Sequence, residues 1–119
     1  MPYEAILQDL VRSVDRVEGA LLLDATGEVV IAAGSAQMRH RLIGAYQGIV
    51  LGQAQRMAGR HALGGVRFML WRHGGGTVIV RPLRDGYYLV VNLAPEGDVA
   101  RGLHRSAGVQ ERLNQALAR

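Results

Sequence analysis

The sequence predicts an α/β domain of the α+β type, built on a five-stranded antiparallel sheet. One long helix is expected on one face of this sheet, and the N- and C-terminal helices on the other. Three observations support the prediction: apolar residues at helical spacing near both chain ends, five β-prone runs, and one long helical stretch between the second and third runs. A chain of 119 residues is expected to form one domain, here residues 1–119, which buries about two-thirds of its unfolded surface.

The first half of the chain predicts a helix, a hairpin and a second, longer helix. Apolar residues near the N-terminus recur at spacings of three and four, which is typical of an amphipathic helix. These residues are Tyr3, Ile6, Leu7, Leu10 and Val14. The β-prone runs at residues 19–23 and 28–33 flank a turn, and this pattern indicates a hairpin. The long helical stretch follows from about Ala36 to His61, with Ser35 as its candidate N-cap.

The second half predicts three strands and a last helix. The strands are expected at residues 66–72, 77–83 and 87–93, joined by a glycine run and by the turn dipeptide Asp85-Gly86. The final amphipathic helix has its apolar positions at Val99, Leu103, Ala107, Leu113 and Leu117. Because tight turns join every consecutive pair of strands except the pair around the long helix, an antiparallel sheet is the simplest arrangement.

The composition excludes several kinds of chemistry. The chain has no cysteine, which removes disulfides and thiolate sites and fits a reducing compartment, so we expect a cytoplasmic protein. All fourteen basic residues are arginines, so a phosphate-binding lysine loop, a Schiff base and a lysine general base are excluded. The first fifteen residues lack the pattern of a signal peptide, and the longest uncharged stretch is too short to cross a bilayer, so no stable membrane insertion is expected.

The four histidines are the main candidates for acid–base chemistry near neutral pH, but none has a partner at metal-ligand spacing. A solvated or capping role is therefore favoured for His40, His61, His73 and His104. The glycine run at residues 74–76 joins two predicted strands rather than leading into a helix, so a hairpin tip is favoured over an anion-binding loop. The sequence predicts no catalytic residues, no metal and no cofactor.

The long helix carries an unusual glycine stripe. On a helical projection, its broad apolar side is expected to cover the sheet; this side contains Leu42, Tyr46, Ile49, Val50 and Met57, with Ile43 at its margin. The opposite side carries Gly44, Gly48 and Gly52, which together cost about 2 to 3 kcal/mol of helix propensity. Close approach of another helix would offset that cost. The alternative is a helix turned the other way, with its glycines on the sheet.

The arginines in the middle of the chain and the strand at residues 66–72 belong to the same candidate interaction surface as the long helix. No acidic residue lies between Glu28 and Asp85, whereas eight arginines do, so this region is expected to attract an acidic partner unless the charges are only solvated surface. The strand at residues 66–72 is the sheet edge that we expect a second copy to pair. The candidate dimer or partner contacts are Arg41, Gly44, Gly48, Leu51, Gly52, Gln55, Arg56, Gly59, Arg60, Phe68, Leu70 and Trp71.

Two sequence segments add a family resemblance. The phrase at residues 17–24 leading into residues 26–30, and the strand at residues 88–91, resemble the Roadblock/dynein light chain family. The resemblance covers nearly the whole chain. It implies a homodimer or heterodimer whose sheets join across an edge, and a signalling role, because bacterial members of that family commonly regulate Ras-like GTPases.

Three functions are compatible with these observations. The favoured one is a non-enzymatic homodimeric module that binds a Ras-like small GTPase and alters its nucleotide cycle, in the manner of a GTPase-activating protein, or its localisation. The alternative is a structural dimerisation scaffold for another signalling assembly, without effect on nucleotide hydrolysis. Nucleic-acid binding is the least favoured, because aromatic residues are few and the arginines are dispersed through several elements.

Overall fold

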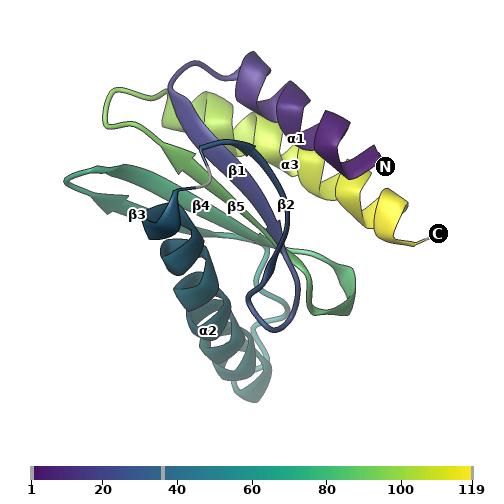
Figure 1. Cartoon of the computed structure of the whole chain (residues 1–119). Helices are drawn as coiled ribbons and strands as arrows, with labels where there is room; N and C mark the ends of the chain where they lie inside the picture. The colour runs from purple at the N-terminus through teal and green to yellow at the C-terminus, as the bar shows by residue number, and fades with distance from the viewer. Residues whose placement is uncertain (1, 36, 119) are drawn as a thin grey trace.

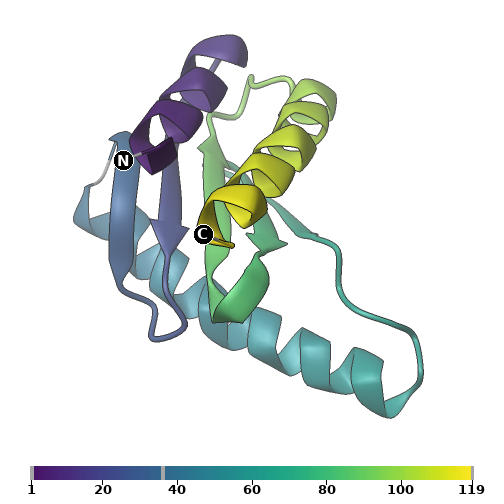
Figure 2. The same ribbon diagram turned by 90° about the vertical axis from the view of Figure 1, so that its right-hand side faces the viewer.

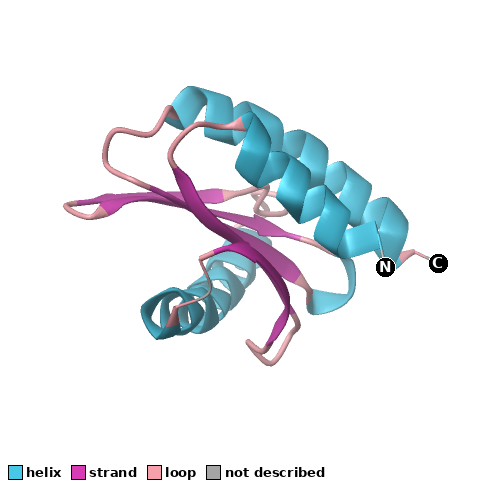
Figure 3. Cartoon of the chain, turned by 45° about the horizontal axis from the view of Figure 1, so that its top comes forward, coloured by secondary structure: helices cyan, strands magenta, loops and turns pink. Residues whose placement is uncertain are grey.

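A computed structural model describes residues 2–35 and 37–118. The chain forms three layers, with α1 and α3 on one face of a five-stranded sheet and α2 on the other (Figures 1 and 3). The elements in chain order are α1 (Pro2–Ser13), β1 (Val17–Leu23), β2 (Val29–Gly34), α2 (Met38–Arg60), β3 (Met69–His73), β4 (Gly76–Pro82), a 3-10 turn (Arg84–Gly86), β5 (Tyr88–Leu93) and α3 (Val99–Leu117). The predicted fold class and arrangement of layers are confirmed. The predicted start of the long helix at Ala36 lies outside the described residues.

The sheet has the order β2-β1-β5-β4-β3, and every neighbouring pair is antiparallel. Residues of β1 and β5 occupy the centre, where Leu21 lies opposite Val90. β2 and β3 are the two edges. The β1–β2 pairing contains an irregularity near Leu22, whereas the β3–β4 register runs without a shift from Met69↔Val80 to His73↔Gly76. β3 is therefore the more regular of the two edge strands.

The larger core lies between the sheet and the pair α1 and α3. Both helices bury one apolar stripe, and their fully buried residues include Leu7, Leu10 and Leu113. α3 begins at a side-chain cap, because a carboxylate oxygen of Asp98 accepts a hydrogen bond of 3.0 Å from the Arg101 amide. Gly102 lies inside this helix because a Cβ there would sit 3.1 Å from the Leu93 side chain. Close packing on the sheet thus accounts for a glycine that weakens the helix in isolation.

The orientation expected for α2 is wrong. Gly44 is buried against the sheet, where a Cβ would lie 3.1 Å from Leu23 and 3.3 Å from Leu21. Leu51 and Ala58 are also buried. The side that was expected to cover the sheet is instead exposed, with exposed fractions of 50% for Leu42, 64% for Tyr46, 59% for Ile49 and 56% for Met57. The alternative helix phase, with its glycines on the sheet, is therefore the one found.

The physical reason for this orientation is the side chain of Tyr88. It rises from β5 beneath α2, and its hydroxyl donates a buried hydrogen bond of 2.9 Å to the Gly44 carbonyl. A Cβ on Gly48 would lie only 2.5 Å from that hydroxyl oxygen. Only glycine leaves room for the tyrosine at this position. Figure 2 shows α2 running along the sheet on the side opposite α1 and α3.

We predict that Gly48→Ala destabilises the protein by about 1 to 3 kcal/mol, because the added methyl group overpacks Tyr88. The matched control is Gly59→Ala in the same helix, where a Cβ meets no atom within 4 Å. That change should stabilise the protein by up to about 1 kcal/mol through helix propensity. Chemical denaturation measures both free energies of unfolding. Equal stabilities of the two variants would show that Gly48 does not face Tyr88.

We also predict an alkaline loss of stability that depends on Tyr88. Burial raises the pKa of the Tyr88 hydroxyl above its ordinary value of 10.0, and the Asp24 carboxylate raises it further. A raised pKa in the folded state contributes stability below the unfolded pKa, and this contribution is lost as the pH rises through the folded pKa. Stability should therefore fall above pH 10.0, the ordinary tyrosine value.

Tyr88→Phe tests this pH dependence. The variant should be less stable at pH 7 by about 0.5 to 1.5 kcal/mol, because the hydrogen bond to Gly44 is lost. The difference in stability between the variant and the parent should become smaller as the pH rises above 10.0. The chain contains no lysine, so lysine titration does not obscure the effect. Urea denaturation of both proteins across this pH range measures their free energies of unfolding. A difference between the two that does not change with pH would contradict the burial of the hydroxyl.

Candidate interaction surface

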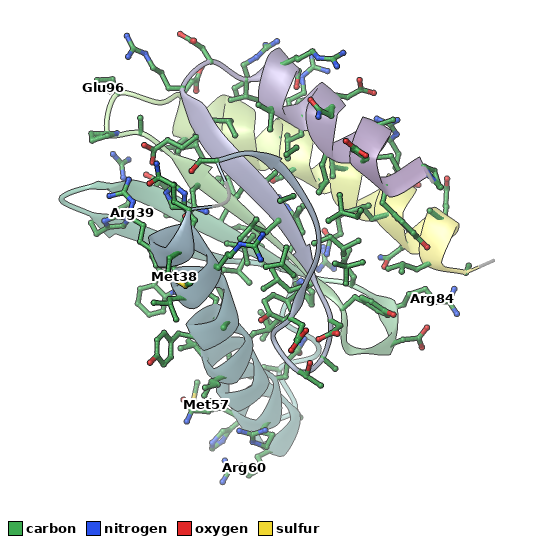
Figure 4. All side chains as sticks on the ribbon, in the orientation of Figure 1. Met38, Arg39, Met57, Arg60, Arg84 and Glu96 are labelled. Atoms are coloured by element: carbon green, nitrogen blue, oxygen red, sulfur yellow. The ribbon has the colours of Figure 1, made fainter. Side chains whose placement is uncertain are left out.

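The outer side of α2 is an exposed apolar strip on the face opposite α1 and α3. It consists of Met38, Leu42, Tyr46, Ile49 and Met57. Figure 4 shows Met38 near the first turn of this helix, and Met57 and Arg60 near its last turns. Isolated exposed apolar residues are common, but a row of them along one helix, here interrupted by the exposed Gln53, is a candidate interaction surface. We call these five residues the α2 strip.

Arginines surround the α2 strip at both ends of the helix. Arg39 and Arg41 are exposed near its start, and Arg56 and Arg60 near its end. Arg39 forms a long ion pair of 3.7 Å with Glu18, and both side chains remain partly exposed. Cations near the C-terminal end of a helix are favourable, because the helix dipole is negative there. The strip is thus mainly apolar and has basic residues near both ends.

The edge strand β3 continues this surface beside α2. Its backbone pairs with β4 on one side only, which makes it an edge of the sheet as predicted. Trp71 is exposed and lies opposite Val78, a residue of the core beneath α2. Leu70 is half-buried and packs against the core on the other face of the sheet. An unpaired edge beside an exposed tryptophan is suited to pairing with another chain.

Phe68, just before β3, is held by a buried arginine. The Arg81 guanidinium lies 5.0 Å from the centre of its ring, which is a cation–π contact. Arg81 donates to the Ser106 hydroxyl at 2.8 Å and to the Leu103 carbonyl at 2.8 Å, so it also ties the sheet to α3. Burial lowers the pKa of Arg81. The start of the edge strand is therefore fixed to the rest of the domain.

The predicted contact residues divide into accessible and inaccessible positions. Gly44 and Leu51 are buried beneath α2 and offer no surface within the protomer. Gly48 and Gly52 are half-buried, and so is Gln55, whose side-chain oxygen accepts a hydrogen bond of 3.0 Å from the Val66 amide. The accessible predicted positions are Arg41, Arg56, Gly59, Arg60, Phe68 and Trp71. Their contact with a partner remains a prediction.

Sequence reasoning missed the α2 strip as a contact surface. The periodicity predicts that four of its residues, Leu42, Tyr46, Ile49 and Met57, cover the sheet, because they are larger and more apolar than those on the glycine side. Two glycines on the other side, Gly44 and Gly48, fit closely against the sheet instead, and Ala58 on that side is buried as well. The signal available in the sequence was the helix-propensity cost of the glycines, which close packing on the sheet offsets.

The histidines lie at separate places in the fold. His61, His73 and His104 are exposed, whereas His40 is buried in the first turn of α2 with its Nδ1 2.9 Å from the Ser35 hydroxyl oxygen.

The glycine run forms the tip of the β3–β4 hairpin, as predicted. Within residues 2–35 and 37–118, no group of three or more His, Asp or Glu side chains is arranged to hold a metal ion. Among the helices described, none combines the length and the apolar character needed to span a bilayer.

These features identify a class of protein. The family model of the Roadblock/LC7 domain matches residues 4–92, and the chain belongs to this family. The predicted family resemblance is thus confirmed. Comparison with curated protein sequences gives no match.

Solved structures share the fold over nearly the whole chain. A Roadblock/LC7 domain from Streptomyces avermitilis is 20% identical with a TM-score of 0.86, covering 98% of each chain. MglB from Myxococcus xanthus is 12% identical with a TM-score of 0.88, covering 99% of this chain and 96% of its own. A structure of MglB with a tetrameric arrangement is 13% identical with a TM-score of 0.84, covering 96% and 86%. At these identities the similarity establishes the common fold.

Proposed function

We propose that this chain is a non-enzymatic homodimeric adaptor that binds a Ras-like small GTPase in the cytoplasm and modulates its nucleotide cycle or localisation. The observation that supports this best is the α2 strip, an exposed apolar surface with arginines at both ends and no acidic residue from residue 29 to residue 84. A surface of this kind favours a protein partner with apolar and acidic groups.

The geometry of the sheet supports self-association through β3. Two copies of β3 can pair antiparallel around a two-fold axis perpendicular to the sheet, which is an isologous contact. Such pairing joins two five-stranded sheets and places both α2 helices on the same face of the joined sheet. The side of α2 nearest β3, which includes Ile43 and Val50, would then meet its copy. Burial of this apolar surface would stabilise the dimer.

The partner assignment rests on the family and on charge. Bacterial Roadblock proteins commonly regulate Ras-like GTPases, and the surface described above is basic, so an acidic face of such a GTPase would be attracted to it. An exposed arginine such as Arg56 or Arg60 could act as an arginine finger. We favour a different action, in which binding orients the GTPase's own catalytic groups, because that requires no particular residue of this chain.

The dimer is tested by substitution in the α2 strip. We predict that the parent protein has twice the chain mass of 12.9 kDa at micromolar concentration. Tyr46→Glu should shift it to the monomer mass without loss of secondary structure, because Tyr46 is exposed in the protomer and lies one helical turn from both Ile43 and Val50, the residues that would meet the second copy. The control is Ala107→Glu, an exposed position on α3.

Light scattering and circular dichroism measure these states. A parent protein that stays monomeric, or a Tyr46→Glu variant as dimeric as the Ala107→Glu control, would contradict the proposed dimer.

The GTPase function is tested with a purified Ras-like small GTPase, chosen as the one encoded nearest this gene in its genome. We expect the GTP-loaded form to bind, and the rate of phosphate release to change when this protein is added. Intrinsic hydrolysis by Ras is on the order of 10⁻⁴ s⁻¹, so acceleration is readily measured. Binding with unchanged phosphate release and nucleotide exchange would support the scaffold alternative. No binding in either nucleotide state would contradict the proposed partner.

A further inference from the structure

A groove of about 300 Å³ lies between the β1–β2 turn and one side of α2. Its lining includes Thr26, Gly27, Ala45, Ile49, Gly52 and Arg56. The turn approaches the helix closely, since a Cβ on Gly27 would lie 3.5 Å from the Ala45 backbone. We call this hollow the Arg56 groove.

The groove is open because the side chains facing it are small. Gly52 is half-buried, and a Cβ there would meet only the Arg56 guanidinium, at 3.5 Å. Arg56 therefore lies back along the helix toward Gly52 and presents its guanidinium to the hollow. Tyr88 closes the inner end of the groove, with its hydroxyl already bonded to Gly44.

The lining of the groove contains one cationic side chain, and the Asp24 carboxylate lies in the β1–β2 turn outside the lining. Arg56 is the one lining residue with an ionised side chain, and among the described residues no carboxylate forms an ion pair with it. The nearby Asp24 is occupied within its own turn, where one carboxylate oxygen accepts from the Thr26 amide at 2.9 Å, the Thr26 hydroxyl at 2.6 Å and the Glu28 amide at 3.1 Å. These bonds lower the pKa of Asp24. On its other side, Arg56 lines a second hollow together with Arg60 and His61.

The groove lies away from the edge that would pair with a second copy. Gly52, Ala45 and Arg56 occupy the side of α2 toward the β1–β2 turn, whereas Ile43 lines a separate hollow with His73 of β3 and Thr77 of β4. β2 and β3 are at opposite edges of the sheet. A dimer formed through β3 therefore leaves one Arg56 groove open on each protomer.

We propose that the Arg56 groove receives an acidic side chain from a surface segment of the bound GTPase, with the carboxylate paired to Arg56 and an adjacent apolar side chain against Ile49. This inference rests on the proposed function. A planar guanidinium binds a carboxylate through two parallel hydrogen bonds, which gives geometric specificity as well as attraction. The opposite sides of α2 then have separate roles, self-association on one and partner selection on the other.

Two variants separate the shape of the groove from its charge. Gly52→Leu fills the hollow and keeps the arginine, whereas Arg56→Gln keeps the hollow and removes the charge. The matched controls are Gly108→Leu, an exposed glycine of α3 with no atom within 4 Å of its Cβ position, and Arg105→Gln, an exposed arginine of the same helix. Neither control residue lines the Arg56 groove.

The first readout is the affinity of each variant for the GTP-loaded Ras-like GTPase. We expect Gly52→Leu and Arg56→Gln each to weaken binding by about tenfold or more, the scale of a lost charge-assisted contact. The controls should stay within about twofold of the parent, a difference of about 0.4 kcal/mol. Unchanged binding by both groove variants would overturn the groove assignment and leave the proposed function intact.

The second readout uses a short glutamate-rich peptide as a probe, observed by amide chemical shifts of the protein. We expect the shifts to concentrate at Gly27 and Gly52 and to disappear in Arg56→Gln and Gly52→Leu, but not in the controls. If no GTPase binds while the peptide still occupies the groove, the proposed function fails and the acidic-segment site stands. Shifts spread over all arginines, or unchanged in the two groove variants, would overturn the site.

Discussion

The hydrogen bond from the Tyr88 hydroxyl to the Gly44 carbonyl holds α2 against the sheet, and the interaction surface depends on it. For the tyrosine to fit, the helix must have no Cβ at Gly48. This requirement fixes which side of the helix is buried. Rotation of the helix by half a turn would bury Tyr46 and Ile49 and would leave the hydroxyl of Tyr88 without this partner.

The orientation of α2 then determines what the rest of the surface can do. Since the small residues face the sheet, the large apolar ones face outward, and the domain carries the α2 strip at the cost of exposed apolar area. An exposed strip of this kind is stable in solution only when another surface covers it or charges surround it. The regular edge strand β3 lies on one side of the strip and the Arg56 groove on the other. In the proposed assembly, the second copy and the GTPase therefore use different sides of one helix.

Most of the fold could be predicted from the sequence, because its signals are local. The terminal helices have clear apolar periodicity, and the hairpins have glycine and aspartate at their turns. Which side of α2 faces the sheet could not be predicted in the same way, because both sides contain residues that can be buried. What decides between them is the position of Tyr88, forty residues or more further along the chain. The Arg56 groove also escaped prediction, since it forms only where the β1–β2 turn meets the helix.

Part of the candidate surface could be predicted from the sequence, namely the edge strand and the basic residues of α2. Both Phe68 and Trp71 are exposed, but only Trp71 lies in the edge strand, because β3 begins at Met69 and not at residue 66 as predicted. The exposed arginines of α2 were also identified. Which of them lines the Arg56 groove depends on where the β1–β2 turn packs against α2, a long-range contact that the spacing of residues within the helix does not reveal.

Hydroxyl-radical footprinting of the aromatic and methionine side chains tests the central claim most directly. The claim is that α2 presents its strip outward and uses it for association. Tyr88 should be protected under all conditions, whereas Tyr46 and Met57 should react in diluted protein and become protected on dimerisation or when the GTPase is added. Reactivity of Tyr46 and Met57 that stays the same in every assembly, or oxidation of Tyr88 in the folded protein, would contradict the account.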